Sequence, residues 1–362
     1  MASHLYNNLQ ISSDQASFLA QTYFGITGKA TPLPGEVDIN FKIKTSDGNS
    51  YILKVSRPGM DHQYIDFQLK ILLHLADTAP EITVPKIILN KDGNAYSTFT
   101  DHFGEARLVR MLSWIEGRLW SSVQPIHDKL LYDLGKSGGK ITKALQSFQH
   151  PFAKRVFEWD IDQALWIENY VHLFDTDKNI IVSHFLIKFV AQKKLLDLLR
   201  KSVIHNDTND NNILVNISPD HPDVISIIDF GDAIYTSTIN DLAVCIAYAV
   251  MEKPDPLAAA IQVVKGYNEK FVLLDAELNM LHLLVAMRLI ISVTKSARNK
   301  LSEPNNEYLL ISEKPAWELL RQWINIDEHL AYYTFRHACG LVPHPDLEVF
   351  KTWANNHPFG IA

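Results

Sequence analysis

The spacing of hydrophobic and polar positions changes along the chain, and the change predicts two parts. Residues 12–26 have helical spacing, opened by Ser12 and Gln15 in capping-box register. Strict alternation follows in NFKIKTSDGNSYILKV, two short runs around a hairpin turn at Asp47-Gly48. Helical spacing returns in DHQYIDFQLKILLHLA, and two more strands are predicted in VPKIILN and ARLVRMLSW, separated by a turn at Asp92-Gly93. This first part is therefore expected to be a mainly antiparallel sheet with a helix laid across it.

From about Leu119 onward the spacing is mostly helical, as in VSHFLIKFVAQKKLLDLLRK. The exception is residues 202–234, where two apolar runs too short for helices flank turn-forming residues. The pattern shifts near residues 114–117, so we predict an N-terminal lobe of residues 1–113 and a C-terminal lobe of residues 114–362. The expected fold class is α+β, with a small antiparallel-sheet lobe and a larger, mainly helical lobe.

Composition narrows the class of protein. The 362 residues are 47% hydrophobic and carry a net charge of -7 without long like-charge runs, which argues against a nucleic-acid partner. The two cysteines, Cys245 and Cys339, suit neither a disulfide framework nor a zinc site. The start of the chain lacks the features of a signal peptide, and LHLLVAMRLIISV is interrupted by Arg288. We therefore expect a cytoplasmic protein with buried apolar helices and no membrane partner.

Residues 202–234, SVIHNDTNDNNILVNISPDHPDVISIIDFGDAI, combine polar side chains in a way that suggests chemistry. Asp207 follows the first apolar run and can accept a proton from a substrate hydroxyl. Asn212 lies five residues later, and Asp229 ends the next strand, so both can offer oxygen ligands to Mg²⁺. Taken singly, these residues are also what an ordinary polar turn contains.

A lysine in the first part strengthens the catalytic interpretation. Lys54 lies in SYILKV, on the strand that leaves the Asp47-Gly48 turn, among apolar neighbours. Such a lysine can hold the phosphates of a nucleotide, although a solvated strand lysine is the plainer alternative. Phosphoryl transfer needs little beyond aligned oxygens, a proton acceptor and positive charge over the phosphates.

The chain resembles the protein-kinase-like phosphotransferases of small molecules, which include aminoglycoside phosphotransferases and choline kinases. Within them it is most similar to hydroxylysine kinases and to the kinase-like domain fused to class III aminotransferases. The resemblance rests on LPGEVDINFKI, FEWDI, IHNDTNDNNILV, IDFGDAI, DLAVCIAYA and FRHACG, which span most of the chain. It implies a bilobal protein-kinase-like fold, with the nucleotide-binding lobe first and the catalytic, acceptor-binding lobe second.

The resemblance also implies roles for individual residues. Asp207 becomes the catalytic base, Asn212 and Asp229 become the Mg²⁺ ligands, and Lys54 becomes the phosphate-contacting lysine. The loop around Gly35 covers the phosphates of ATP or GTP, and His205 supports the catalytic loop. The segment that meets the purine through its backbone consists of Met111, Leu112, Ser113 and Trp114.

Two positions depart from the pattern of the related kinases. The first loop has the single glycine Gly35 instead of G-x-G-x-x-G, and an isolated glycine after a proline is often only a turn. Gln68 stands where many relatives carry a glutamate that pairs with the lysine, and Asp66 lies close by in the sequence. Either residue remains a candidate partner for Lys54. Asp241, before a long apolar run, is predicted to be a helix N-cap.

The acceptor is expected to be a small molecule. Only DAIYTSTIN separates Gly231 from the next apolar helix, which leaves no room for a peptide-docking segment ending in A-P-E. Asp160 and Asp232 are candidates to bind a cationic amine. Arg288 either takes a substrate carboxylate or is satisfied by a buried acid. Hydroxylysine is the favoured acceptor, an aminoglycoside or homoserine stays open, and the alternative is a non-catalytic nucleotide-binding module.

Overall fold

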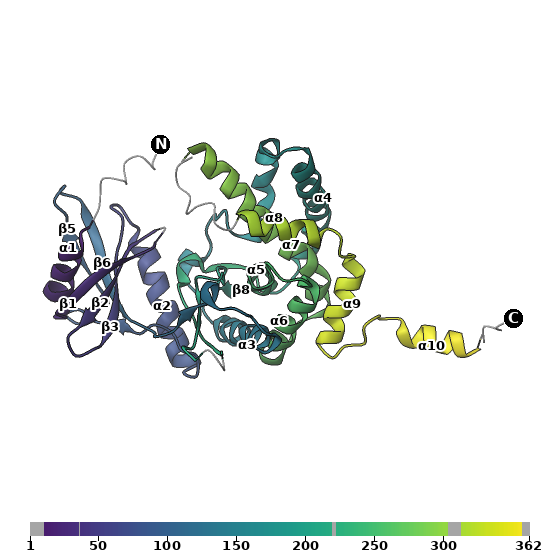
Figure 1. Ribbon diagram of the computed structural model, residues 1–362, viewed down its shortest axis with the longest axis horizontal. Helices are drawn as coiled ribbons and strands as arrows, with labels where there is room; N and C mark the ends of the chain where they lie inside the picture. Colours follow the sequence, from purple (N-terminus) through teal and green to yellow (C-terminus); the bar gives the residue numbers. More distant parts are fainter. Residues whose placement is uncertain (1–10, 36, 219–221, 303–312, 357–362) are drawn as a thin grey trace. The chain divides into compact units, whose positions relative to one another are not determined.

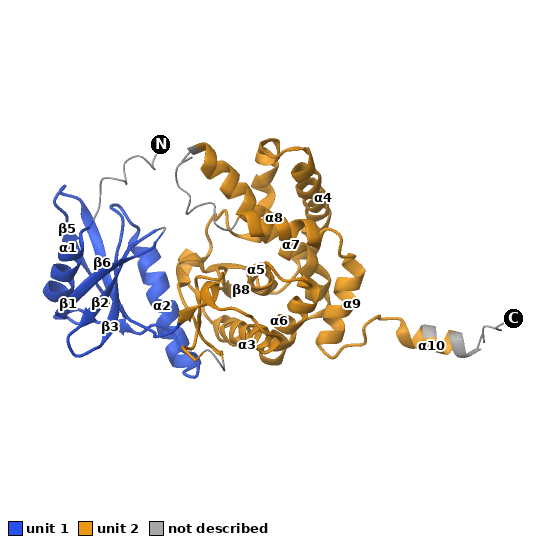
Figure 2. Cartoon of the chain, in the orientation of Figure 1, with its two compact units in different colours: residues 1–117 blue, residues 118–362 orange. Residues whose placement is uncertain are grey.

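The computed structural model describes residues 11–35, 37–218, 222–302 and 313–356. The first ten residues, which were expected to carry no signal peptide, lie outside this range. The chain forms two compact units, residues 1–117 and residues 118–362 (Figures 1 and 2). The division therefore falls after Gly117, beside the sequence segment 114–117 at which the pattern changes.

Unit 1 is built on one antiparallel sheet. Its strands are β1 (Gly28–Leu33), β2 (Ile39–Thr45), β3 (Ser50–Val55), β4 (Ile87–Ile88), β5 (Tyr96–Thr100) and β6 (Ala106–Ser113). They follow the order β1-β2-β3-β6-β4, and β5 also pairs with β6. Its helices are α1 (Ser13–Leu19), continued by the π-helical turn η2 (Ala20–Phe24), and α2 (His62–Thr78) (Figure 1).

Alternation of side chains along the strands separates the two faces of this sheet. Odd-numbered positions such as Phe41, Leu53 and Val109 are buried in one apolar cluster with residues of α1 and η2. Even-numbered positions point to the other face, and a hydrogen bond from Arg110 to Gln68 connects that face to α2. The polar residues at even positions are therefore held apart from the main apolar cluster.

The local predictions for unit 1 are largely confirmed. Ser12 and Gln15 form the capping box before α1, and β2 and β3 form the hairpin, with Gly48 at φ 90°. Strand β5 was not predicted, because YSTFT is partly exposed throughout and lacks an apolar face. The strand predicted in VPKIILN is reduced to the two residues of β4.

Unit 2 is mainly helical and carries two small antiparallel sheets, β10-β9-β7 and β11-β8. Its strands are β7 (Arg118–Leu119), β8 (Lys201–Ile204), β9 (Ile213–Val215), β10 (Val224–Ile227) and β11 (Ile234–Ser237). Its α-helices are α3 (Asp128–Leu145), α4 (Thr176–Asp197), α5 (Ile239–Ala249), α6 (Pro256–Lys270), α7 (Asp275–Ser302), α8 (Glu313–Trp323), α9 (Glu328–Ala338) and α10 (Leu347–Asn356). Short 3₁₀ segments are η3 (Trp120–Ser122), η4 (Pro151–Ala153), η5 (Ile161–Leu173) and η6 (Phe230–Asp232).

Helix α7 forms the centre of unit 2. It is long and apolar enough to cross a membrane by length and composition, but 89% of its most apolar stretch is buried within the structure. This burial is what a core helix of a globular unit requires. Arg288, in the middle of α7, is 1% exposed and is the charged residue that interrupts the apolar run.

Helices α3 and α6 approach each other closely because glycines face each other at the contact. A Cβ added at Gly135 would lie 2.0 Å from the carbonyl oxygen of Val263, and one at Gly266 would lie 1.9 Å from that of Tyr132. Neither position therefore has room for a side chain. The close approach allows the Tyr267 hydroxyl of α6 to donate to Thr142 of α3 at 2.7 Å.

Candidate active site

The loop between β8 and β9 carries the residues predicted to be catalytic. Strand β8 ends at Ile204, and the next residues are held in a tight, irregular path in which Asn206 has φ 64°. A non-glycine residue in the left-handed region is uncommon and persists where its surroundings fix it. Here the backbone N–H of Asn206 donates to the Asp241 carboxylate at 3.0 Å, which holds the loop in place.

The carboxylate of Asp207 is oriented by three side-chain donors. Asn212 Nδ2 donates to Oδ2 at 2.6 Å, and Asn209 Nδ2 donates to Oδ1 at 2.9 Å. Arg288 Nη2 reaches the same Oδ1 at 3.3 Å. The side chain of Asp207 nevertheless stays 21% exposed. A carboxylate that is fixed in direction and still open to a solute is suited to accept a proton from a bound hydroxyl.

Opposing effects act on the charge of Asp207. Burial in the loop raises the pKa of this carboxyl well above its ordinary value, and the neighbouring Asp232 carboxylate raises it further. The guanidinium of Arg288 and the amide of Asn209 act in the opposite direction. Arg288 is therefore the nearby cation that favours the ionised, proton-accepting form of Asp207.

His205 supports this loop from inside. It is 1% exposed, and its Nδ1 accepts a hydrogen bond from the backbone N–H of Asp207 at 3.1 Å. Its Nε2 lies 2.9 Å from the carbonyl oxygen of Ile228, so the proton is assigned to Nε2. Burial lowers the pKa of the imidazole, which agrees with a neutral ring. The ring thus joins the Asp207 loop to the segment that leads to Asp229.

The two candidate metal ligands come from connected pieces of backbone. Ile228 donates its N–H to the carbonyl oxygen of Asn212 at 2.8 Å, and the next residue is Asp229. Because Nδ2 of Asn212 is used by Asp207, its amide oxygen is directed elsewhere. Asp229 is exposed, has φ 64° and accepts a hydrogen bond from the N–H of Gly231 at 3.3 Å. One amide oxygen and one exposed carboxylate form a donor set that fits Mg²⁺.

Asp241 proves to be a support of the catalytic loop, and its prediction as a helix N-cap is wrong. Helix α5 begins at Ile239, two residues before Asp241. The Asp241 carboxylate instead accepts from Asn206 and, at 2.8 Å, from Thr142, which in turn accepts from Tyr267. Burial of this carboxylate is compensated by hydrogen bonds from Thr142 of α3 and from the Asn206 backbone, a relation between distant segments that sequence spacing does not reveal.

The three residues predicted to contact the acceptor have different surroundings. Asp160 is 2% exposed, caps η5, and accepts hydrogen bonds from Asp162, Gln163 and Thr236 at 3.1, 2.8 and 2.7 Å. Its carboxylate is thus used within the fold and does not face an acceptor. Arg288 contacts a nearby acid, which was one of the two alternatives given for it, and that acid is Asp207.

Asp232 is partly buried, and its backbone carbonyl accepts from Asn206 at 3.4 Å. Because its charge raises the pKa of Asp207, Asp232 is the acid of this group that lies near the Asp207 carboxylate. It stays a candidate for binding a cationic group of the acceptor.

A second charged cluster in unit 2 was not predicted. Glu158 accepts from Lys295 at 3.0 Å and from Arg298 at 2.7 Å, and these three side chains remain 42%, 20% and 32% exposed. Lys295 and Arg288 both lie over the ring of Trp159, at 5.0 and 4.5 Å from its centroid. The cluster therefore adjoins the arginine that contacts Asp207. The sequence segment FEWDI contains Glu158 and Trp159, but the basic residues that pair with Glu158 lie more than a hundred residues later.

The nucleotide-binding candidates of unit 1 centre on Lys54. This lysine is 7% exposed and lies on β3 between Asn40 of β2 and Arg110 of β6. Arg110 donates to Asp38 at 2.7 Å and to the side-chain oxygen of Gln68 at 2.9 Å. The oxygen of Gln68, one of the two predicted partners of Lys54, is therefore already in use by an arginine. Neither Asp38 nor Arg110 was predicted from the sequence.

The other predicted nucleotide contacts are placed as follows. Gly35 has no room for a Cβ, which would lie 2.4 Å from the side-chain nitrogen Nδ2 of Asn40. Met111 and Leu112 pair within the sheet, with Leu53 and Ile52 of β3.

Beyond them, the N–H groups of Ser113 and Trp114 donate to Lys86 and Ser50 at 2.8 and 3.2 Å. Those two N–H groups are thus occupied within unit 1 and are not available to a purine. Backbone recognition at Ser113 and Trp114 would have to use their carbonyl groups.

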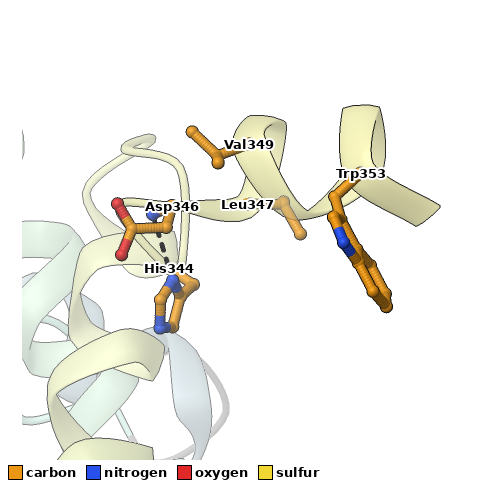
Figure 3. A pocket seen from close by; sticks show the side chains of 5 residues that line it. All are labelled: His344, Asp346, Leu347, Val349 and Trp353. Carbon is orange, nitrogen blue, oxygen red and sulfur yellow. Dashed lines mark hydrogen bonds between the residues drawn. The ribbon is translucent and has the colours of Figure 1, made fainter. Parts of the chain in front are cut away.

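A hollow in a different part of unit 2 lies against helix α10 (Figure 3). It is lined by His344, Asp346, Leu347, Val349 and Trp353. His344 and Asp346 are joined by a hydrogen bond from the backbone N–H of Asp346 to His344 Nδ1 at 3.0 Å. None of these residues belongs to the segments that carry Asp207, Asn212 or Asp229, so the hollow is not part of the candidate active site.

Comparison with known proteins decides the family. The model of the phosphotransferase enzyme family, APH, matches residues 29–272, which include Lys54, Asp207, Asn212 and Asp229. The chain belongs to this family. A hydroxylysine kinase of Mus musculus is 28% identical over 87% of this chain and 89% of its own length. A hydroxylysine kinase of Danio rerio is 30% identical over 86% of this chain and 92% of its own length.

Solved structures show the same fold. An amicoumacin kinase in complex with AMP-PNP, Ca²⁺ and Ami aligns with a TM-score of 0.67 at 18% identity, over 91% of this chain and 99% of its own. A microcompartment-associated aminopropanol kinase aligns with a TM-score of 0.63 at 18% identity, over 84% and 95%. The predicted α+β, protein-kinase-like fold class is confirmed. The family and the hydroxylysine kinase relatives make the chain a small-molecule kinase that acts on a hydroxyl acceptor.

Proposed function

We propose that this kinase transfers the γ-phosphoryl group of ATP or GTP, with Mg²⁺, to the hydroxyl of a hydroxylated amino acid of the hydroxylysine type. The observation that carries the proposal is the Asp207 carboxylate, which is held by Asn209, Asn212 and Arg288 while its side chain stays 21% exposed. The similarity to hydroxylysine kinases over most of the chain supports this acceptor class.

In the proposed reaction, Asp207 orients the acceptor hydroxyl and receives its proton as the oxygen bonds to the γ-phosphorus. The bond from that phosphorus to the bridging oxygen breaks, and the nucleoside diphosphate leaves with its electron pair. Asn212 and Asp229 are the residues that would hold Mg²⁺, which neutralises negative charge on the phosphates when bound. Lys54 of unit 1 is assigned to the phosphates, as the family resemblance implies.

Arg288 is assigned a positioning role in this reaction. It donates to the backbone oxygen of Trp159 at 2.9 Å and to Asp207 at 3.3 Å, so its planar group is held on two sides. A fixed cation at this point keeps the carboxylate in one direction. It also favours the ionised form that a general base requires.

The acceptor's head group is assigned to the cluster of Glu158, Lys295 and Arg298. An amino acid carries an ammonium and a carboxylate on the same carbon, and this cluster offers one acidic and two basic side chains beside the ring of Trp159. A second amine near the hydroxyl, as in hydroxylysine, would suit Asp232. Amino alcohols have no carboxylate for Lys295 and Arg298 to bind and should therefore be poorer acceptors.

The proposal is tested by measuring nucleoside diphosphate release from ATP and from GTP with Mg²⁺. The acceptors are 5-hydroxylysine, homoserine, choline, ethanolamine and kanamycin, with Asp207→Asn as the control variant. We expect 5-hydroxylysine to be preferred and Asp207→Asn to lower kcat by roughly 10²–10⁴-fold. Preference for kanamycin or choline would overturn the acceptor class. Nucleotide binding without turnover on any acceptor would favour a non-catalytic binding module.

A further inference from the structure

Lys54 lies among polar side chains of three adjacent strands. Asn40, Lys54 and Arg110 stand opposite one another on three adjacent strands, β2, β3 and β6. Directly opposed residues share a face of the sheet, so the three side chains are neighbours. They are 8%, 7% and 2% exposed. Two buried cations side by side repel each other, and the fold must compensate their charge.

That compensation reaches Arg110 from the loop before β2. Asp38 Oδ2 accepts from Arg110 Nη2 at 2.7 Å, and Oδ1 lies 3.5 Å from Nη1, so the contact is forked. The same Nη2 donates to the side-chain oxygen of Gln68 on α2 at 2.9 Å. Arg110 therefore ties three elements together: the β1–β2 loop, strand β6 and helix α2.

Two buried polar atoms in this group have no hydrogen-bond partner among the residues that the structure describes. They are the side-chain oxygen Oδ1 of Asn40 and the side-chain nitrogen Nε2 of Gln68. Leaving such atoms unpaired costs free energy, and they usually mark a position where a partner is expected. Asn40 Oδ1 is an acceptor suited to a proton of the Lys54 ammonium, whereas Gln68 Nε2 is an enclosed donor beside the contact between Gln68 and Arg110. Both belong to residues that flank Lys54 and Arg110.

The phosphate-covering loop is built onto the same group. Asn40 Nδ2 donates to the carbonyl oxygen of Pro34 at 3.2 Å. A Cβ at Gly35 would lie 2.4 Å from that same nitrogen and 2.4 Å from the carbonyl oxygen of Asp38. Gly35 is thus required because the loop folds tightly against Asn40 and Asp38. Its role is close packing and not a glycine-rich cradle.

We infer that Asp38, Arg110, Gln68 and Asn40 form a positioning network that holds Lys54 and the β1–β2 loop for the phosphates of the nucleotide. In this network the Asp38 carboxylate of the loop acts through Arg110, which also binds Gln68 of α2. Asn40 Oδ1 accepts a proton of the Lys54 ammonium, and Gln68 holds Arg110 through its side-chain oxygen. The inference rests on the proposed function, because it presumes that Lys54 binds the nucleotide.

The first test compares two buried arginines of strand β6. Arg107 is 1% exposed and faces Asp101 at 3.6 Å, but it lies three residues from Arg110 and therefore on the opposite face. We expect Arg110→Met to weaken ADP and GDP binding by about tenfold, because Lys54 and the β1–β2 loop would lose their support. The nucleotide KM should rise more than kcat falls. Arg107→Met should lower the melting temperature comparably and leave nucleotide affinity unchanged.

The second test restores an acid on α2. In the double variant Arg110→Met/Gln68→Glu, the new glutamate is free to pair with Lys54, and nucleotide affinity should recover at least half of the loss on a logarithmic scale. Circular dichroism melts of each full-length variant establish that it folds. Recovery of affinity without recovery of the melting temperature would separate positioning from general stability.

Equal effects of Arg110→Met and Arg107→Met on nucleotide binding would overturn the network while leaving the proposed function intact. So would a failure of Gln68→Glu to restore any binding in the folded double variant. A wild-type chain that binds neither ADP nor GDP would instead overturn the proposed function. Calorimetric binding of the diphosphates is the readout, so these outcomes do not depend on knowing the acceptor.

Discussion

Each unit buries an arginine beside an aspartate, and the two pairs are built for different purposes. In unit 1, Arg110 and Asp38 are 2% and 5% exposed and lie 2.7 Å apart. In unit 2, Arg288 is equally buried, but Asp207 is 21% exposed and its contact with the arginine is longer, 3.3 Å. The unit 1 carboxylate is fully enclosed, whereas the unit 2 carboxylate keeps one side open.

This difference shows how the surroundings of an aspartate decide its use. Enclosing both charges demands a short, forked contact, because desolvation must be compensated within the protein. An open carboxylate needs less compensation, since water or a substrate can complete its hydrogen bonds. Asp38 is therefore suited to hold structure, and Asp207 is suited to exchange a proton with a bound hydroxyl.

Removing each arginine should lower the stability of the two units by clearly different amounts. Arg110→Met leaves Asp38 buried and uncompensated, which is expected to cost about 3–5 kcal/mol of stability in unit 1. Arg288→Met should cost clearly less in unit 2, because Asp207 can turn toward solvent. Urea unfolding of both variants, with separate fits where the units unfold apart, measures the difference. A larger loss for Arg288→Met would show that exposure of the aspartate does not set the cost.

Much of this arrangement could be predicted from the sequence. The hairpin around Asp47-Gly48, the capping box at Ser12 and the short strands around Asp207 follow from local spacing, which depends on neighbouring residues alone. The order Asp207, Asn212 and Asp229 is also local, because one loop and the following hairpin carry all three. These features need no knowledge of distant contacts.

The rest depends on pairs that are distant in the sequence. Arg110 contacts Asp38 from 72 positions away, and Arg288 contacts Asp207 from 81 positions away. An arginine inside an apolar strand or helix signals that a buried acid exists, but the sequence does not say which one. The same limit explains Asp160, which looked available to an acceptor and is used by Thr236 and Gln163 instead.

A third way to bury a titratable group is to keep it neutral, and His282 is buried in this way. It is 6% exposed on α7 and stacks on Trp323, with ring centroids 5.1 Å apart. Burial lowers its pKa from 6.5 to about 4, against the carboxylates of Glu328 and Asp327, which act to raise it, while Lys188 adds to the lowering.

Protonation of His282 is thus disfavoured in the folded state, and its contribution to stability is fully present above pH 6.5. It should be lost as the pH falls toward 4, by about 3 kcal/mol in total. His282→Gln should be less stable at pH 7 but show a flatter dependence between pH 6.5 and 4. Urea midpoints across that range compare the two proteins. Parallel pH profiles would exclude His282 as the source of the acid sensitivity.

Changing the shape of the cation beside Asp207 should have a smaller effect, on rate. Arg288→Lys keeps the charge but loses the planar group that lies over Trp159 and Tyr248, at 4.5 and 5.5 Å from their ring centroids. We expect kcat to fall by roughly 10–100-fold with little change in nucleotide KM, because Asp207 would be held less firmly.

Arg288→Met is the matched variant without charge, and its kcat should be lower still. Steady-state kinetics with the preferred acceptor supply both numbers. Equal kcat values for the lysine and methionine variants would mean that the charge of Arg288 does not assist Asp207. A rise in nucleotide KM alone would move its role from the base to the donor.

The smallest effect is expected for the acid on α2 that the sequence left as a possible partner of Lys54. Asp66 forms an ion pair with Lys70 of the next helical turn at 2.8 Å, with the two side chains 45% and 55% exposed. Exposed pairs of this spacing contribute only about 0.3–0.5 kcal/mol. Loss of this ion pair in Asp66→Asn should therefore lower the unfolding free energy by about that amount.

The same substitution should leave ADP and GDP affinity unchanged, because the carboxylate that binds Arg110 in the proposed network is that of Asp38. Asp38→Asn is the contrasting variant, and it should lose both stability and nucleotide affinity. Calorimetric titration of the two variants under identical salt compares an exposed acid on α2 with a buried acid on the loop. If Asp66→Asn weakened nucleotide binding as much as Asp38→Asn, an exposed acid of α2 would support Lys54 as well as the enclosed acid does. Enclosure of Asp38 would then not explain how unit 1 binds the nucleotide.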